Sequence, residues 1–120
     1  YKDSDIALHV ESFDRKYRLA TRVSFSTKII DLMASSCAVM AICWEGQTGY
    51  RYLKEQDAAF CVSSENEILS MLSYIVEHPQ QIPVYAEKAW RCGRKYHDRA
   101  SIQKQIRSVF QKLSGVDNRW

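Results

Sequence analysis

The chain has 120 residues, 46% hydrophobic and 26% charged, which suits one globular domain with its own core. No run of about 20 apolar residues occurs, so we expect no membrane-spanning helix, and the amino terminus has no signal-peptide pattern. The cysteines are far apart and form no C-x-x-C or His/Cys pair, so we expect no metal or other cofactor and reduced thiols in the cytoplasm; they are Cys37, Cys43, Cys61 and Cys92.

The net charge of +3 is unevenly distributed along the chain. Residues 1–86 carry 8 basic and 11 acidic side chains, whereas residues 87–120 carry 9 basic and 3 acidic ones. Such a basic end is either a solvated helix surface or a contact for nucleic acid, an anionic membrane surface or an acidic partner domain.

A strand is predicted over residues 5–10, because a near-continuous apolar run is typical of a parallel sheet covered on both faces. His9 lies within this run and is interpreted as a core or cleft-edge residue rather than a ligand. Glu11 follows the strand at its carboxyl end, where ligands bind in open α/β sheets.

Residues 12–24 have no clean periodicity and contain Arg15, Lys16, Arg18 and Arg22. A loop of this length in a compact domain is usually functional or mobile. We therefore expect either a flap that contacts phosphates or a disordered insertion, and the sequence does not choose between them.

A short helix is predicted next, because Phe25, Ile29, Ile30 and Met33 have helical spacing on one face. Ser26 or Thr27 is a suitable N-cap, through a hydroxyl that accepts from the first turn. Lys28, Asp31 and Ser35 lie on the other face, and the Ser/Thr-rich loop at 24–27 could offer free N–H groups to an anion. An ordinary capped helix packed on a sheet is the alternative.

In the rest of the chain, predicted strands again alternate with predicted helices. Strands are predicted over 37–43 and 58–62, with a glycine-containing loop at 44–49 and a short helix at 50–56. Ser63 or Ser64 should cap a helix over 65–77, and Pro83 should lie in the first turn of a helix that runs to residue 98. A last helix over 100–113 should end at Gly115 and bury an apolar stripe of Ile102, Ile106, Val109, Phe110 and Leu113.

Strands that alternate with helices predict an α/β fold with a Rossmann-like parallel sheet and flanking helices. The loops at the carboxyl ends of the strands should then share one rim of the sheet, where Glu11, the 24–27 loop and the 44–49 loop would meet.

One stretch resembles the donor-binding motif of GT-B glycosyltransferases, especially the retaining enzymes of family 4. The matching residues are Phe25, Ser26, Thr27, Lys28, Asp31, Ala34, Ala38, Val39 and Ala41. The weaker resemblance extends over roughly 3–113, so residues 1–120 would be a single domain or domain fragment, the second half of a donor-binding domain with C-terminal helices at 83–113.

This resemblance implies a nucleotide-sugar-binding part of a retaining glycosyltransferase that transfers a sugar to a hydroxyl of a glycan or lipid. Asp31 would bind the ribose hydroxyls, and the backbone N–H groups of Phe25, Ser26 and Thr27 would bind the pyrophosphate, assisted by Lys28. Glu11 would stand at the same rim. The family's donor domain needs no bound metal.

The family usually has two acidic residues separated by seven, and the first position falls on Val23 here. The catalytic residues are therefore unassigned. A non-catalytic α/β interaction module and a nucleotide-sugar epimerase of GT-B architecture remain as alternatives.

The resemblance also implies partners: a nucleotide diphosphate sugar and the N-terminal acceptor domain of a longer polypeptide. A peripheral membrane contact stays open, and we expect no nucleic-acid partner. Because the strand that would lie beside 5–10 belongs to the missing half of the sheet, strand 5–10 should form a bare edge through which the chain can self-associate.

Overall fold

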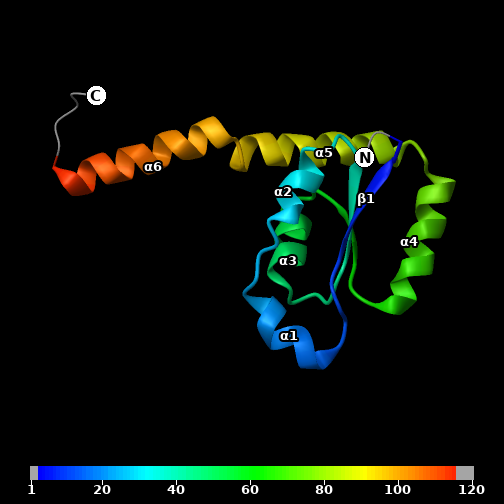
Figure 1. Ribbon diagram of the computed structural model, residues 1–120. Helices are drawn as coiled ribbons and strands as arrows, with labels where there is room; N and C mark the ends of the chain where they lie inside the picture. The colour runs from blue at the N-terminus through cyan, green and yellow to red at the C-terminus, as the bar shows by residue number, and fades with distance from the viewer. Residues whose placement is uncertain (1–2, 116–120) are drawn as a thin grey trace.

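The computed structural model describes residues 3–115, which form a three-stranded parallel sheet flanked by helices (Figure 1). The strands are β1 (Ile6–Val10), β2 (Ala38–Ile42) and β3 (Phe60–Val62), in the order β1-β2-β3. Ala7 is in register with Val39, and Ala41 with Cys61. The α/β class and the Rossmann-like parallel sheet are confirmed.

Two helices cover one face of the sheet: α2 (Lys28–Met33) and α3 (Thr48–Glu55). Ile29 and Leu32 of α2 and Leu53 of α3 are fully buried there against Val39 and Ala41 of β2. The predicted apolar stripe of the 25–33 segment therefore does face the core, and Leu32 joins it.

The opposite face is covered by α4 (Glu65–Glu77), which packs Ile75 and Ile68 against Met40, Phe60 and Val62. The longer helix α5 (Gln81–Tyr96) contributes to both cores. Its first turns, with Tyr85, pack on the α4 side, and Ala89 and Cys92 pack on the α2 side. Figure 1 shows α5 crossing the amino ends of the strands, so the carboxyl ends are left open.

The expectation of an aperiodic loop over 12–24 is wrong, because Arg15–Arg22 form a helix, α1. The Asp14 side chain caps it by accepting from the backbone N–H of Lys16 at 3.2 Å. No residue of α1 is buried, and Leu19 is 82% exposed. Its periodicity is one of charge, because Arg15, Arg18 and Arg22 share one face, and a helix without buried apolar residues does not show the apolar spacing from which helices were predicted.

The last helix, α6 (Arg99–Ser114), lies at the predicted residues but does not pack as predicted. Gly115 ends it at φ 60°, the left-handed conformation that glycine adopts readily. The expected burial of its apolar stripe is wrong: no residue of α6 is buried, and the helix extends from the body as a free arm (Figure 1).

The cap of α4 also differs in its chemistry. Ser64 occupies the N-cap position but its hydroxyl makes no capping bond. Instead the Glu67 carboxylate accepts from the backbone N–H of Ser63 at 2.8 Å, which lowers the pKa of Glu67. None of the helices in residues 3–115 combines the length and the apolar character needed to cross a membrane.

Candidate functional site

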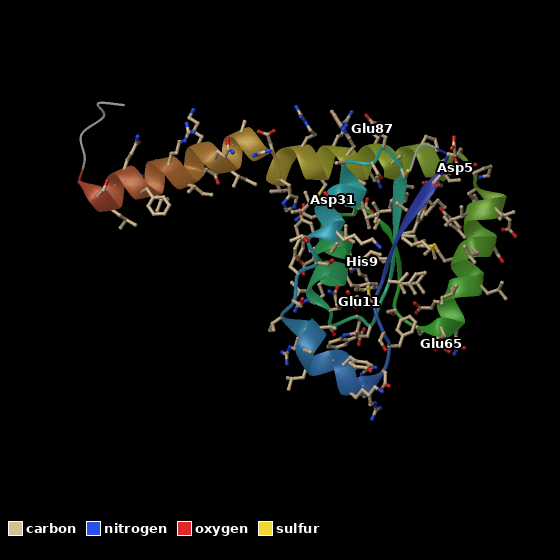
Figure 2. All side chains as sticks on the ribbon, viewed as in Figure 1. Asp5, His9, Glu11, Asp31, Glu65 and Glu87 are labelled. Carbon is tan, nitrogen blue, oxygen red and sulfur yellow. The ribbon has the colours of Figure 1, made fainter. Side chains whose placement is uncertain are left out.

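The carboxyl ends of β1 and β2 are joined where their loops begin. The backbone N–H of Glu11 donates to the carbonyl of Ile42 at 3.0 Å, one step beyond the paired strands. Glu11 is half-buried, and Figure 2 shows it below His9 at this end of β1. The structure thus places Glu11 at the open rim of the sheet, where the sequence predicted it.

Gln47 connects the 24–27 loop to this rim. Its side chain is only 1% exposed, and its Oε1 accepts from the backbone N–H of Tyr50 at 2.6 Å, which caps α3. Its Nε2 donates to the carbonyl of Ser24 at 3.1 Å. A buried glutamine with both ends paired fixes the start of the 24–27 loop against α3. Sequence analysis did not identify this residue.

The loop after β2 also holds helix α1. Trp44 Nε1 donates to Thr21 Oγ1 at 3.0 Å, and the Arg18 guanidinium lies over the Trp44 ring at 5.2 Å from its centroid. The Thr48 hydroxyl donates to the carbonyl of Arg22. These contacts attach the basic helix α1 to the rim by its side chains, without burying it.

His9 is 2% exposed, as expected for a core or cleft-edge residue. Burial lowers its pKa, against the opposing effects of the Glu11 carboxylate and of the Gln47 side chain, and the Lys28 charge lowers it further. Its Nε2 has no hydrogen-bond partner within residues 3–115. Helix α2 packs against β1, and the charge of Lys28 at the start of α2 acts on His9.

The 24–28 segment has a buried side and an open side. The Phe25 ring packs edge-on against Tyr52 at 5.4 Å and stacks near His97 at 6.3 Å. Thr27 occupies the N-cap position of α2, as predicted, but its backbone is already helical and its hydroxyl does not make the predicted capping bond. The backbone N–H groups of Phe25, Ser26 and Thr27 donate to no acceptor in the described part of the chain.

Asp31 lies on the solvent face of α2, as its spacing indicated. Its carboxylate makes no ion pair or hydrogen bond with residues 3–115, in contrast to Asp57, which pairs with Lys88. In Figure 2 Asp31 lies farther from the carboxyl end of β1 than His9 and Glu11 do. The structure therefore does not bring Asp31 and Glu11 together.

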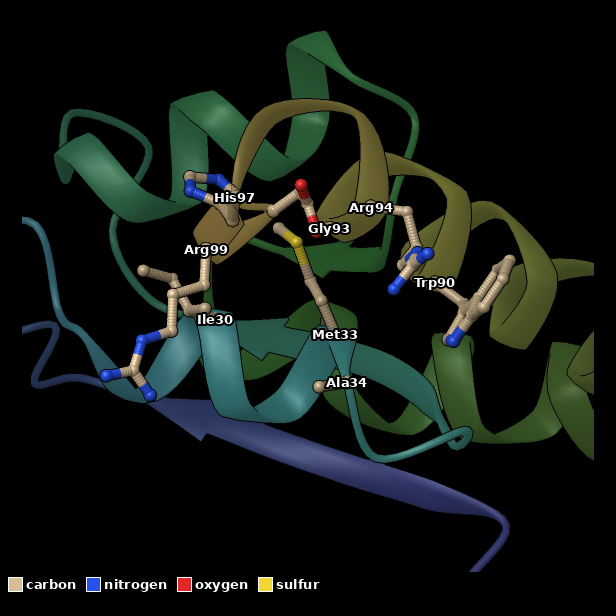
Figure 3. Close-up of a pocket in the computed structure, with 9 residues that line it drawn as sticks. Ile30, Met33, Ala34, Trp90, Gly93, Arg94, His97 and Arg99 are labelled. Carbon is tan, nitrogen blue, oxygen red and sulfur yellow. The ribbon is translucent and has the colours of Figure 1, made fainter. Parts of the chain in front are cut away.

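A hollow of about 310 Å³ lies between α2 and α5 (Figure 3). Ile30, Met33 and Ala34 of α2 form its apolar side, so Asp31 stands on the same short helix beside it. Its other side carries the Trp90 ring, the guanidinium groups of Arg94 and Arg99, the His97 imidazole and the Asp98 carboxylate. Sequence analysis missed this hollow, although Trp90 and Arg94, four residues apart, share one face of a helix.

The cysteines near the rim are poor nucleophiles. Burial, together with the Glu11 charge, raises the pKa of Cys43 to about 12, and burial raises the pKa of Cys61 to about 11. Within residues 3–115 no group of three or more His, Cys, Asp or Glu side chains could hold a metal ion. What this region offers a ligand is amide donors, carboxylates and cationic side chains.

These features define an α/β protein with a Rossmann-like parallel sheet whose carboxyl rim is open. A scan of protein-family models, a search of curated proteins and a search of solved structures each found no match to the chain. The family suggested by the 25–41 resemblance is accordingly taken up as a proposal.

Proposed function

We propose that this chain is the nucleotide-sugar-binding part of a retaining glycosyltransferase of GT-B architecture. The polypeptide that contains it would transfer a sugar from a nucleotide diphosphate sugar to a hydroxyl of a glycan or lipid. The acceptor would be bound by an N-terminal domain of that polypeptide.

One observation carries the proposal: the segment that resembles the donor motif has unused hydrogen-bonding groups. Three consecutive amides, of Phe25, Ser26 and Thr27, are unpaired within the described residues, and Lys28 and Asp31 follow on the exposed side of the same segment. In a loop with only a structural role, such groups would form hydrogen bonds within the protein or with water. A diphosphate matches the amides and the Lys28 ammonium, and ribose hydroxyls match the Asp31 carboxylate.

Gln47 and Phe25 would act as positioning residues. The Gln47 side chain holds the start of the loop, and the Phe25 ring anchors its middle between Tyr52 and His97. A loop that is fixed at both points presents its amides without a large ordering cost on binding. Glu11, at the end of β1, would stand at the sugar side of the rim.

A non-catalytic binding module is the second candidate, and one residue favours it. Val23 occupies the family's first acidic position, cannot ionise, and is 83% exposed at the end of α1. Donor binding through Asp31 and the loop amides does not need that acid, whereas transfer does. The two candidates therefore share the binding site and differ in turnover.

Calorimetric titration with uridine and guanosine diphosphate sugars tests the proposal in the polypeptide that carries the acceptor domain. Asp31→Asn should weaken binding by about 10- to 100-fold, because a charged acceptor to the ribose hydroxyls is lost. Glu55→Gln, which removes a carboxylate from the exposed end of α3, is the matched control and should leave affinity unchanged. Equal affinity in the wild type and the Asp31 variant would rule out the assigned role.

A further inference from the structure

Helix α6 carries an unpartnered apolar face. Five residues form one stripe along it, here called the α6 stripe, and each is at least 37% exposed: Ile102, Ile106, Val109, Phe110 and Leu113. At 100° per residue they fall within a sector about 100° wide, the width with which an amphipathic helix packs on a protein surface. Nothing in residues 3–115 covers this stripe.

A second unpartnered apolar surface lies between β1 and α4. A cavity of about 640 Å³ is lined there by Val10, Phe13 and Ile42 on one side and Ile68 on the other, with Glu11 and Glu65 at its rim. Leu8, two residues before Val10 on the same face of β1, is 47% exposed, and Leu72, one turn beyond Ile68 on α4, is 45% exposed. We call this surface the β1–α4 groove.

The two surfaces are opposite in charge. The charged side chains that line the groove are those of Glu11 and Glu65, and no lysine or arginine lines it. Residues 99–114 contain Arg99, Lys104, Arg107 and Lys112 and no acidic side chain. An α6 laid in the groove would therefore bring basic side chains to these two carboxylates.

The lengths also match, and α6 points away from the groove of its own chain. At about 1.5 Å per residue, the 16 residues of α6 span about 24 Å and the 13 residues of α4 about 20 Å. Figure 1 shows α6 leaving the body at the end of α5, on the side opposite α4. In this arrangement α6 can reach only the groove of another molecule.

We propose that α6 of one copy of this chain docks in the β1–α4 groove of a second copy. Reciprocal exchange of α6 between two copies closes a dimer, whereas one-way docking would build an open chain of copies. One association accounts for both unpartnered surfaces and for their opposite charges, and it does not depend on the proposed nucleotide-sugar binding.

Sedimentation velocity of the 14.0 kDa chain at tens to hundreds of micromolar tests the association. We expect a species of about twice the monomer mass or larger. Added salt should weaken the association, because basic side chains of α6 pair with acidic side chains of the groove. Reversing the charge of α6, with Lys104→Glu, Arg107→Glu and Lys112→Glu, should raise the dissociation constant of the association by at least about tenfold. Since α6 buries no residue in its own chain, these changes leave the fold intact, which circular dichroism checks.

Reversing the charge of the groove, with Glu11→Lys and Glu65→Lys, should have the same effect. A mixture of the arm-reversed and groove-reversed chains should then associate as well as the wild type, because each arm meets an opposite groove again. Arg51→Glu with Arg91→Glu, at exposed positions of α3 and α5 outside both surfaces, is the matched control and should not change the association.

A photo-crosslinking residue at position 110 locates the contact directly. We expect products of two chains in which position 110 is joined to peptides from 3–14 or 63–78. A monomer throughout this concentration range, a dimer indifferent to both charge reversals, or crosslinks to other peptides would each overturn the proposal. So would a monomer that binds phosphatidylglycerol vesicles through α6.

Discussion

At residue 9 the chain buries an imidazole between two charged groups. His9 is 2% exposed, with the Glu11 carboxylate near one side and the Lys28 charge also acting on it. Burial outweighs the carboxylate, so the pKa of His9 is lower in the folded chain than in the unfolded one. The residue is a structural part of the candidate rim, and it makes the rim sensitive to acid.

The consequence is a pH-dependent stability. Because the unfolded chain binds a proton to this imidazole more readily, the free energy of unfolding should fall as pH drops from 7 through the ordinary histidine pKa. Urea unfolding at pH 7.0 and 5.0 measures the difference. His9→Gln should reduce it, because glutamine does not titrate. An equal pH effect in the wild type and the variant would contradict the role of His9.

At the scale of elements, α1 and α6 show that a helix can form here without burying any of its residues. Helix α1 depends on the Asp14 cap and on side-chain contacts with Trp44 and Thr48. Helix α6 depends on Asp98, whose carboxylate accepts from the backbone N–H of Ser101 at 3.0 Å. In both cases local bonds replace the packing that stabilises α2 and α3.

Asp14→Ala should therefore loosen α1 alone. Loss of an N-cap costs about 1 kcal/mol, so amide exchange over 15–22 should accelerate by about fivefold while the global urea midpoint stays unchanged. Asp98→Ala is the matched change in α6 and should act only on 99–114. If Asp14→Ala lowered the global midpoint instead, α1 would be part of the cooperative core, contrary to its exposure.

At the scale of the whole molecule, the shape reflects the free arm. The radius of gyration is 17.5 Å, whereas a compact domain of this length would have about 14 Å. The body formed by the sheet and helices α2 to α5 contains every buried residue of the part that the structure describes. The arm adds extent, charge and apolar surface but no core.

Removal of the arm should accordingly leave the body intact. A chain ending at residue 98 should unfold at the same temperature as the full chain, and its radius of gyration in small-angle scattering should be about 13 Å. The comparison requires dilute samples, in which neither chain is associated. A clear loss of thermal stability in the shorter chain would show that α6 packs on its own body in solution.

Much of this architecture is determined by local pattern. The apolar runs at 37–43 and 58–62 give buried parallel strands, since such runs are typical of a covered sheet, whereas the run at 5–10 gives an edge strand whose Leu8 and Val10 are exposed on one face. The alternation at 25–33 correctly separates Ile29 and Met33, which face the core, from Lys28 and Asp31, which face solvent. Gly115 ends α6 because glycine alone adopts φ 60° at little cost.

Tertiary structure decided the remainder. The spacing of Ile102 and Phe110 is the same whether α6 packs on its own body or on another molecule, because periodicity records only which residues share a face. Gln47 and Trp90 gained their roles from segments far away in sequence, Ser24 and Ala34 among them. Whether the backbone amides of residues 25–27 find acceptors within the chain depends on which segments fold against them. A sequence pattern does not reveal those neighbours.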